Sequence, residues 1–196
     1  MLAGQKFVGK SSLVARFCDN VFNPQMKETI GVAFKKKLVP VKDHIVELNI
    51  WDFGGEDKYR TLFPSYVTGA SGALIVFDLT RKATLDDIDN WIQIIDENTK
   101  NIVKLIIGAK GDLINEREVQ EEDIQKVCDQ YKFCSNPVET SSKTGDNVEK
   151  AFITLCENIL EEKFHFCKKC GKGFPKSLRF CQHCGAKIEE SALKIF

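Results

Sequence analysis

The sequence predicts an α/β protein built on a doubly wound sheet, with a small cysteine-rich module near its C-terminal end. Three observations predict this architecture. Apolar runs typical of buried strands alternate with amphipathic stretches typical of helices. A glycine-rich loop of the kind that joins a strand to a helix follows the first apolar residues, over residues 4–9. Four of the eight cysteines form two closely spaced pairs after residue 166.

The strands can be placed in order along the chain. Only residues 1–3 precede the glycine-rich loop, so either the central strand is short or the natural start lies upstream, and we favour the second explanation. Residues 32–41 and 45–51 are separated by Lys-Asp-His and predict a β-hairpin. Residues 72–78 and 103–108 are mostly apolar and predict buried parallel strands.

Two helices are predicted from apolar positions that recur every three and four residues. We expect Thr84 to cap the first helix, whose inward face is Leu85, Ile88, Trp91, Ile92 and Ile95. We expect the last helix to begin at Asp146, with Glu149 in a capping-box-like position. Its apolar stripe, interpreted as core, is Val148, Phe152, Leu155, Cys156 and Ile159.

Length and composition favour a soluble protein of the cytoplasm. A chain of 196 residues can bury one full core and carry a small appendage. The hydrophobic share of 43% is ordinary for a globular protein. No apolar run approaches the ~18 residues of a membrane span, and the N-terminus lacks the pattern of a secretion signal. We therefore expect a cytoplasmic monomer that reaches membranes only through partners, with cysteines outside the two pairs serving as small core residues.

Charge is distributed unevenly although the formal net charge is zero. Residues 1–162 hold 20 Lys/Arg and 26 Asp/Glu, a net charge of −6. Residues 163–187 hold seven Lys/Arg and no acidic residue. The cysteine-rich module is therefore basic on an acidic body.

The glycine-rich loop matches a phosphate-binding pattern, Gly4-x-x-x-x-Gly9-Lys10-Ser11. Such a loop needs glycine where the backbone bends around phosphate and exposed N–H groups that face the anion. It also needs a lysine for the β and γ phosphates and a hydroxyl for Mg²⁺. The sequence therefore predicts that the protein binds a nucleoside triphosphate.

Four further motifs follow this phosphate loop: Thr29-Ile-Gly31, Trp51-Asp52-Phe-Gly-Gly55, Ala109-Lys110-Gly-Asp112 and Thr140-Ser141-Ser142-Lys143. In their order and spacing, residues 1–162 resemble small GTPases of the Ras superfamily, of Rab or Ras type. The resemblance implies a Ras-like P-loop NTPase fold with a mostly parallel six-stranded sheet, flanking helices and a first strand that is truncated here. It also implies a GTP-binding switch in signalling or vesicle trafficking, with effector, exchange-factor and activating proteins as partners.

The resemblance assigns roles to individual residues. Ser11 and Thr29 would coordinate Mg²⁺, and Asp52 would hold the ion through water. Loss of the γ phosphate would release two loops, about residues 22–31 and 53–66. The full set expected to contact GTP or GDP is Gly4, Gly9, Lys10, Ser11, Ser12, Phe22, Thr29, Gly55, Lys110, Asp112, Ser141, Ser142 and Lys143.

Guanine is the base that these motifs favour. Asp112 can accept hydrogen bonds from both N1–H and the exocyclic amine of guanine, a pairing that adenine does not offer. Lys110 and Lys143 would pack on the ring faces, and the Ser142 N–H would reach the guanine carbonyl. Phe22 resembles the aromatic residue that lies against the base, although a core position suits it equally well.

Three positions depart from the family pattern. Ala109 stands where an asparagine normally ties the base loop (residues 109–112) to the phosphate loop. Nucleotide binding should therefore be weaker, by about 1–3 kcal/mol if a buried partner is left unsatisfied. Lys6 replaces a glycine of the phosphate loop, and Glu56 replaces the glutamine that orients the attacking water, so hydrolysis should be slow or atypical.

The candidate catalytic set is Lys10, Glu56, Lys6 and Thr29, and three interpretations of it remain open. Lys6 stabilises charge in cis while Glu56 positions water, or the two side chains simply pair, or hydrolysis is almost lost. In the last case the protein is a nucleotide-binding scaffold with little turnover.

The cysteine pairs follow the pattern Cys167-x2-Cys170-x10-Cys181-x2-Cys184, which resembles a zinc ribbon. Four thiolates suit tetrahedral Zn²⁺ and leave no open coordination position, so the role of the metal should be structural. Each pair is preceded by phenylalanine and followed by a glycine that permits a tight turn. We expect a GTPase domain over residues 1–162, the ribbon over 163–190 and a short tail over 191–196.

The ribbon is expected to bind a protein partner. Its basic charge keeps open the alternative of a nucleic-acid adaptor, which is less favoured because no series of stacking aromatics accompanies the lysines. No cysteine stands at the C-terminus for prenylation, so we expect no lipid anchor.

Overall fold

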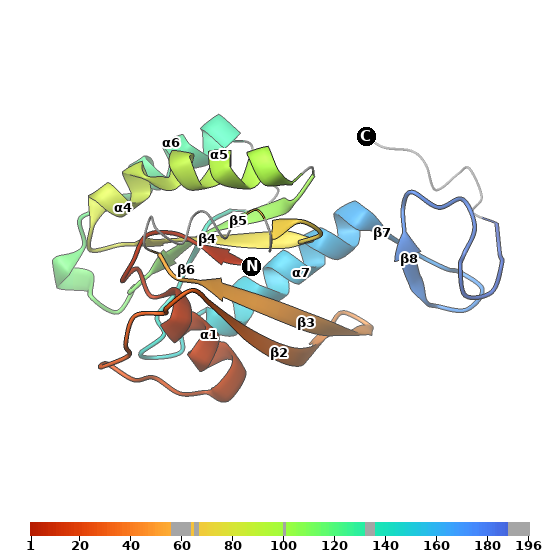
Figure 1. The fold of residues 1–196 in the computed structure, drawn as a ribbon, viewed down its shortest axis with the longest axis horizontal. Helices are drawn as coiled ribbons and strands as arrows, with labels where there is room; N and C mark the ends of the chain where they lie inside the picture. Colours follow the sequence, from red (N-terminus) through yellow and green to blue (C-terminus); the bar gives the residue numbers. More distant parts are fainter. Residues whose placement is uncertain (56–63, 65–66, 100, 132–135, 188–196) are drawn as a thin grey trace.

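The computed structural model describes residues 1–55, 64, 67–99, 101–131 and 136–187. Its body is a sheet with the strand order β2-β3-β1-β4-β5-β6 (Figure 1). The β2–β3 pair is antiparallel and the other neighbouring pairs are parallel, which confirms the predicted mostly parallel six-stranded sheet. The strands are β1 (Leu2–Ala3), β2 (Val32–Val41), β3 (His44–Phe53), β4 (Gly72–Asp78), β5 (Val103–Ala109) and β6 (Val138–Glu139).

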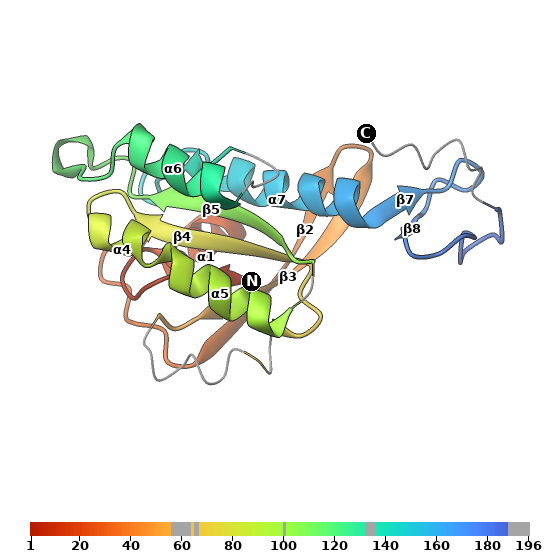
Figure 2. The same ribbon diagram turned by 90° about the horizontal axis from the view of Figure 1, so that it is seen from above.

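Helices cover both faces of this sheet (Figure 2). One face packs against α1 (Lys10–Asp19) and α7 (Val148–Lys163), around a core that includes Phe17 and Phe152. The other face packs against α4 (Lys82–Asp86), α5 (Ile88–Asn98) and α6 (Glu121–Tyr131). A 3₁₀ turn, η1 (Ile114–Glu116), precedes α6. Two apolar layers therefore enclose the sheet, as in a doubly wound fold.

The predicted strands lie close to their expected bounds. β4 spans the expected residues and is buried along its whole length, as a parallel strand covered on both faces should be. The hairpin turn is shorter than expected, because His44 pairs with Val41 and only Lys42 and Asp43 remain between the strands. β1 is short yet central, and Leu2 pairs with residues of both β3 and β4.

The prediction that Thr84 caps a helix is wrong. The chain turns earlier, with the Arg81 N–H bonded to Asp78 O at 3.0 Å, so that α4 begins at Lys82 and Thr84 lies inside it. The Thr84 hydroxyl donates to Arg81 O at 2.7 Å and accepts from the Asp78 N–H at 2.9 Å. The predicted inward face nevertheless holds, because Leu85 and the four apolar positions of α5 are buried.

The predicted capping box at the start of the last helix is also wrong. α7 begins at Val148, and its N-cap Asn147 has a φ of 54° and no side-chain capping bond. The Asp146 carboxylate instead accepts the Thr144 hydroxyl at 2.6 Å, so a local turn competes with the cap. The apolar stripe is confirmed through Cys156, with Ile159 partly buried beside it.

The cysteine-rich module continues α7 without an intervening linker. β7 (Phe164–Phe166) starts directly after α7 and pairs antiparallel with β8 (Gly173–Pro175). Phe174 forms a small core with the buried Cys167 and Cys181. Figure 1 shows the module beyond the end of α7, next to the β2–β3 turn.

Two contacts join the module and the end of α7 to the β2–β3 turn. The His44 and Phe166 rings stack with centroids 4.0 Å apart and an interplanar angle of 7°. Lys42 forms an ion pair with Glu161 at 2.5 Å. The module therefore contacts the hairpin through Phe166, in addition to its direct connection to α7.

Among the helices of the described residues, none has both the length and the apolar character required to cross a bilayer.

Truncating Phe152 to alanine should lower the free energy of unfolding by about 3–5 kcal/mol, because the ring is buried and stacked on Phe17 with centroids 3.9 Å apart. Urea unfolding of the purified protein measures this loss. The control is Phe34→Ala on β2, a residue that is 49% exposed, with an expected loss below about 1 kcal/mol. Equal losses in the two variants would contradict the assignment of the core.

Candidate functional site

A cavity of about 410 Å³ lies where β1, β3 and β5 end. In open α/β sheets this edge is the usual place for a ligand. Most of the predicted site residues line this cavity. Three others, Gly4, Asp52 and Ser141, are outside the lining but form hydrogen bonds with residues that line it. The predicted residues in the lining are Lys6, Gly9, Lys10, Ser11, Ser12, Phe22, Thr29, Gly55, Lys110, Asp112, Ser142 and Lys143.

The phosphate loop is folded tightly between the sheet and α1. Gly4 has a φ of 140°, and a Cβ there would lie 2.1 Å from Val76 O on β4, so only glycine fits. Lys10, the first residue of α1, donates from Nζ to Gly4 O at 2.7 Å and Gln5 O at 2.8 Å. One of its three ammonium protons is left for a ligand.

Burial acts strongly on Lys10. Desolvation lowers the pKa of its ammonium to about 8, against the opposing effect of Asp52 and Glu28. A bound anion in the cavity would stabilise the charged form of this side chain.

Three oxygen ligands converge beside the phosphate loop. The Ser11 Oγ donates to Asp52 Oδ2 at 2.5 Å and lies 2.6 Å from Thr29 Oγ1, and Thr29 Oγ1 lies 3.3 Å from the same carboxylate oxygen. These side chains come from α1, the end of β3 and the segment before β2, far apart in sequence.

The carboxylate of Asp52 fits a cation. Asp52 is 4% exposed, burial raises its pKa, and its Oδ1 is a buried acceptor without a hydrogen-bond partner among the described residues. Hard oxygen ligands next to an anion cavity are the surroundings that Mg²⁺ takes in phosphate sites. The residues present therefore fit the predicted ion.

A second group of polar side chains lies at the base loop. The Ser141 hydroxyl donates to Asp112 Oδ1 at 2.6 Å, which fixes the carboxylate, and Lys143 Nζ lies 3.9 Å from Asp112 Oδ2. Ala109 ends β5, and its methyl carbon would lie 3.7 Å from a Cβ on Gly9. Residue 109 therefore faces the phosphate loop, but with a methyl group that forms no hydrogen bond.

The two predicted mobile segments meet near the phosphate loop. The Gly54 N–H donates to Gly31 O at 2.9 Å. A Cβ on Gly55 would lie 2.3 Å from the Lys6 backbone nitrogen, so glycine is required there. The described part of the second segment therefore touches both the first segment and the phosphate loop.

The residues expected to alter hydrolysis are described only in part. Lys6 is exposed on the cavity wall, with Nζ 5.9 Å from the centroid of the Phe7 ring. Phe7 has a φ of 61° and is 60% exposed. Glu56 lies outside the described residues, so the predicted pairing of Lys6 with Glu56 stays a prediction.

Sequence reasoning missed Arg16, which holds the loop that carries the predicted base contacts. From the last turn of α1 its Nε donates to Ser142 O at 2.7 Å, and its Nη2 donates to Lys143 O at 2.8 Å. No local pattern signals this contact, because it joins residues more than 120 positions apart. It also missed Asp78 and Arg81, which form an ion pair at 2.8 Å beside the cavity.

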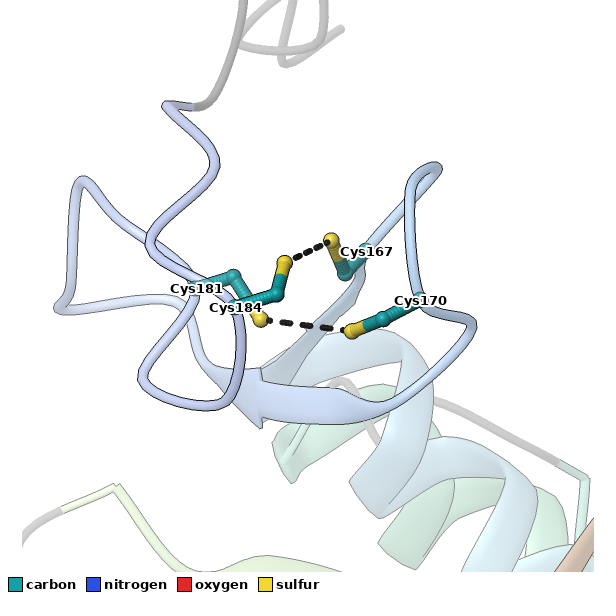
Figure 3. Close-up of side chains that lie close together, drawn as sticks. All are labelled: Cys167, Cys170, Cys181 and Cys184. Carbon is teal, nitrogen blue, oxygen red and sulfur yellow. Dashed lines mark hydrogen bonds between the residues drawn. The ribbon is translucent and has the colours of Figure 1, made fainter.

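The four paired cysteines form one cluster (Figure 3). Their sulfur atoms all lie within 4.8 Å of one another, with Cys167 and Cys184 Sγ 3.5 Å apart and Cys170 and Cys181 Sγ 3.6 Å apart. Four sulfurs bound tetrahedrally to one Zn²⁺ would be separated by about 3.8 Å. The thiols are therefore arranged as a soft four-coordinate metal site requires.

The two knuckles have the same backbone geometry, as expected for an internal repeat. Gly171 and Gly185 both have a φ of 71°, and their N–H groups donate to Cys167 O and Cys181 O at 2.8 Å. Backbone N–H groups that face sulfur favour thiolate. Those of Cys170 and Lys169 lower the pKa of the Cys167 thiol to about 6, despite desolvation.

Comparison with known proteins gives one consistent family. A model described as the Ras family matches residues 1–161. The Ras-related protein Rab-1 of Theileria annulata is 39% identical over 164 residues, covering 83% of this chain and 74% of that protein. The Ras-related protein Rab-8B of Homo sapiens is 35% identical over 181 residues, covering 89% and 86%. The Ras-related protein Rab-18-B of Danio rerio is 39% identical over 163 residues, covering 82% and 78%.

The cysteine cluster should hold one Zn²⁺ for each chain, and Cys181→Ser should remove it, because three thiolates and a hydroxyl form a much weaker site. Metal content of the purified protein and cobalt–thiolate absorbance after exchange measure this. The control is Cys18→Ser, a half-buried cysteine of α1 outside the cluster, which should keep the metal. Full metal content in Cys181→Ser would contradict the four-cysteine site.

Proposed function

Because the chain belongs to the Ras family of small GTPases, we propose that its cavity binds GTP and GDP with Mg²⁺ and that the bound nucleotide switches its affinity for protein partners. The observation that carries this proposal is the meeting of Ser11, Thr29 and the buried Asp52 beside the cavity, with one carboxylate oxygen unpartnered. Mg²⁺ would satisfy that oxygen, directly or through water, and would neutralise charge on the phosphates.

Guanine is the base that the second polar group supports. Asp112 lines the cavity, accepts the Ser141 hydroxyl at Oδ1, and has Oδ2 3.9 Å from Lys143 Nζ. Two carboxylate oxygens on one edge match the two adjacent N–H donors of guanine. Arg16 would support base binding indirectly, because two of its hydrogen bonds hold the loop from which the Ser142 N–H would donate to the guanine carbonyl.

The switch would work through residues 22–31 and 53–66. Thr29 and Gly55 both line the cavity, and the Gly54 N–H donates a hydrogen bond to Gly31 O. A γ phosphate would recruit the Thr29 hydroxyl and the Gly55 N–H, and its loss would remove both contacts. Effector, exchange-factor and activating proteins are the partners that such a switch implies.

Hydrolysis should be slow or atypical. Lys6 places a long cationic side chain on the cavity wall, where an activating protein would otherwise supply an arginine. If the Lys6 side chain stabilises transition-state charge in cis, the protein is a slow or atypical enzyme. If hydrolysis is almost lost, the protein is a nucleotide-binding scaffold without turnover. Weak nucleotide binding through Ala109 would accompany either.

The C-terminal part would be a zinc ribbon over residues 163–190 that binds a protein partner, attached to a GTPase domain over 1–162 and followed by a tail over 191–196. Seven basic residues on the module and exposed apolar side chains at Leu178 and Phe180 support a protein partner that is acidic in part. We propose that the protein acts in the cytoplasm and reaches membranes through such partners.

Guanine nucleotide binding is tested directly by calorimetry with GDP, GTP and ADP in Mg²⁺, with heat expected for the first two only. Asp112→Ala should weaken GDP binding roughly 10- to 150-fold, because a hydrogen-bonded charge contributes about 1.5–3 kcal/mol. The control is Asp86→Ala, an exposed aspartate of α4, with affinity unchanged. Absence of heat with both guanine nucleotides would overturn the proposed function.

Single-turnover cleavage of GTP distinguishes the interpretations of Lys6. If Lys6 acts in cis, Lys6→Gly should slow cleavage roughly 10-fold or more, as loss of a transition-state contact does. A faster Lys6→Gly protein would contradict the cis lysine and indicate obstruction. The cleavage rate of Glu56→Gln is measured beside those of the parent and Lys6→Gly. Undetectable GTP cleavage in all three proteins would identify a scaffold.

A further inference from the structure

A buried carboxylate lies beside Ala109, the position where the family's asparagine is missing. Ala109 ends β5 and pairs in register with Asp78, which ends the neighbouring strand β4. The side chain of Asp78 is completely buried and accepts four hydrogen bonds. The carboxylate beside the missing asparagine is therefore the most heavily used acceptor near the cavity, among the described residues.

The bonds to Asp78 come from two directions. Thr80 donates to Oδ1 from its backbone at 3.0 Å and from its hydroxyl at 2.7 Å, which closes the local turn. Lys110 Nζ lies 2.6 Å from Oδ2, and Arg81 Nε donates to Oδ2 at 2.8 Å. Burial tends to raise the pKa of Asp78, but the bonds from Lys110, Arg81 and Thr80 together hold it below the usual value.

Arg81 extends this group to the phosphate loop. Its Nη2 donates to Lys6 O at 3.2 Å while its Nε holds Asp78. A planar guanidinium can span two acceptors in this way, whereas an ammonium on a flexible chain cannot hold both at fixed angles. The path from phosphate loop to base loop therefore runs from Lys6 O through Arg81 and Asp78 to Lys110.

We infer that Arg81 is a positioning residue that joins the phosphate loop to the base loop through Asp78, in place of the side chain missing at Ala109. This inference rests on the proposed nucleotide site, because it is the bound nucleotide that both loops would have to grip together. Arg81 itself does not line the cavity and acts through Lys6 and Lys110. Breaking the path should let the two loops separate and release the nucleotide faster.

The test measures the dissociation rate of fluorescently labelled GDP from the full chain in Mg²⁺. Arg81→Gln should raise this rate about fivefold, because it removes one charge-assisted contact to the phosphate loop, at Lys6 O, and one to Asp78, which holds Lys110 of the base loop. In an Ala109→Asn background, where the direct contact is restored, the same substitution should change the rate less than about twofold. A merely structural role for Arg81 would cost the same in both backgrounds.

Lys82→Gln is the matched control, since it removes one positive charge at the next residue from a side chain paired with Asp123 on α6, and it should leave the rate unchanged. Arg81→Lys keeps the positive charge but loses the planar guanidinium that spans two acceptors, so its GDP dissociation rate should resemble that of Arg81→Gln. This variant decides the question if Ala109→Asn does not fold, because a rate equal to the parent's would overturn the inference.

An unchanged rate in Arg81→Gln, or an equal increase in both backgrounds, would also overturn it. A parent protein that retains no labelled GDP would overturn the proposed function and this inference with it. A parent that retains GDP while Arg81→Gln behaves like the parent would overturn this inference alone.

Discussion

The buried carboxylate of Asp52 is the constraint on which the arrangement of the site depends. It receives the Ser11 hydroxyl from α1 and lies within reach of Thr29, so one side chain joins three distant segments. Its other oxygen, Oδ1, is buried and has no hydrogen-bond partner among the described residues. Burying an unpaired polar atom costs free energy, so such atoms are rare in folded proteins. The sheet, the phosphate loop and the segment before β2 therefore meet at one carboxylate, whose second oxygen the proposed Mg²⁺ would satisfy.

The fold was predictable where one physical signal dominated. β4 and β5 are short, mostly apolar runs that are buried on both faces, the pattern typical of parallel strands covered by helices on either side. The helix starts were not predictable in the same way, because Thr84 and Asp146 had several possible partners. In each case a turn bond within a few residues competed with the cap and was formed instead.

The candidate site divides along the same line. The phosphate loop and the cysteine knuckles are local motifs whose glycines and ligands can be recognised from spacing, and the structure brings these residues together. The supports of the site are contacts between remote segments. Arg16 reaches Ser142, and Arg81 reaches Lys6 across 75 positions, and an arginine near a helix end has no pattern that reveals its acceptor.

The direct passage from α7 into β7, with Phe166 stacked on His44, sets the geometry of any complex that uses both ends of the molecule. Because no spacer separates α7 from β7, the cysteine-rich module would keep a constant separation from the two proposed switch loops, residues 22–31 and 53–66. A bivalent ligand that matches this separation gains the high effective concentration of an intramolecular second contact, and one that does not match it gains nothing. Shape, more than the strength of either contact, would thus select the partner.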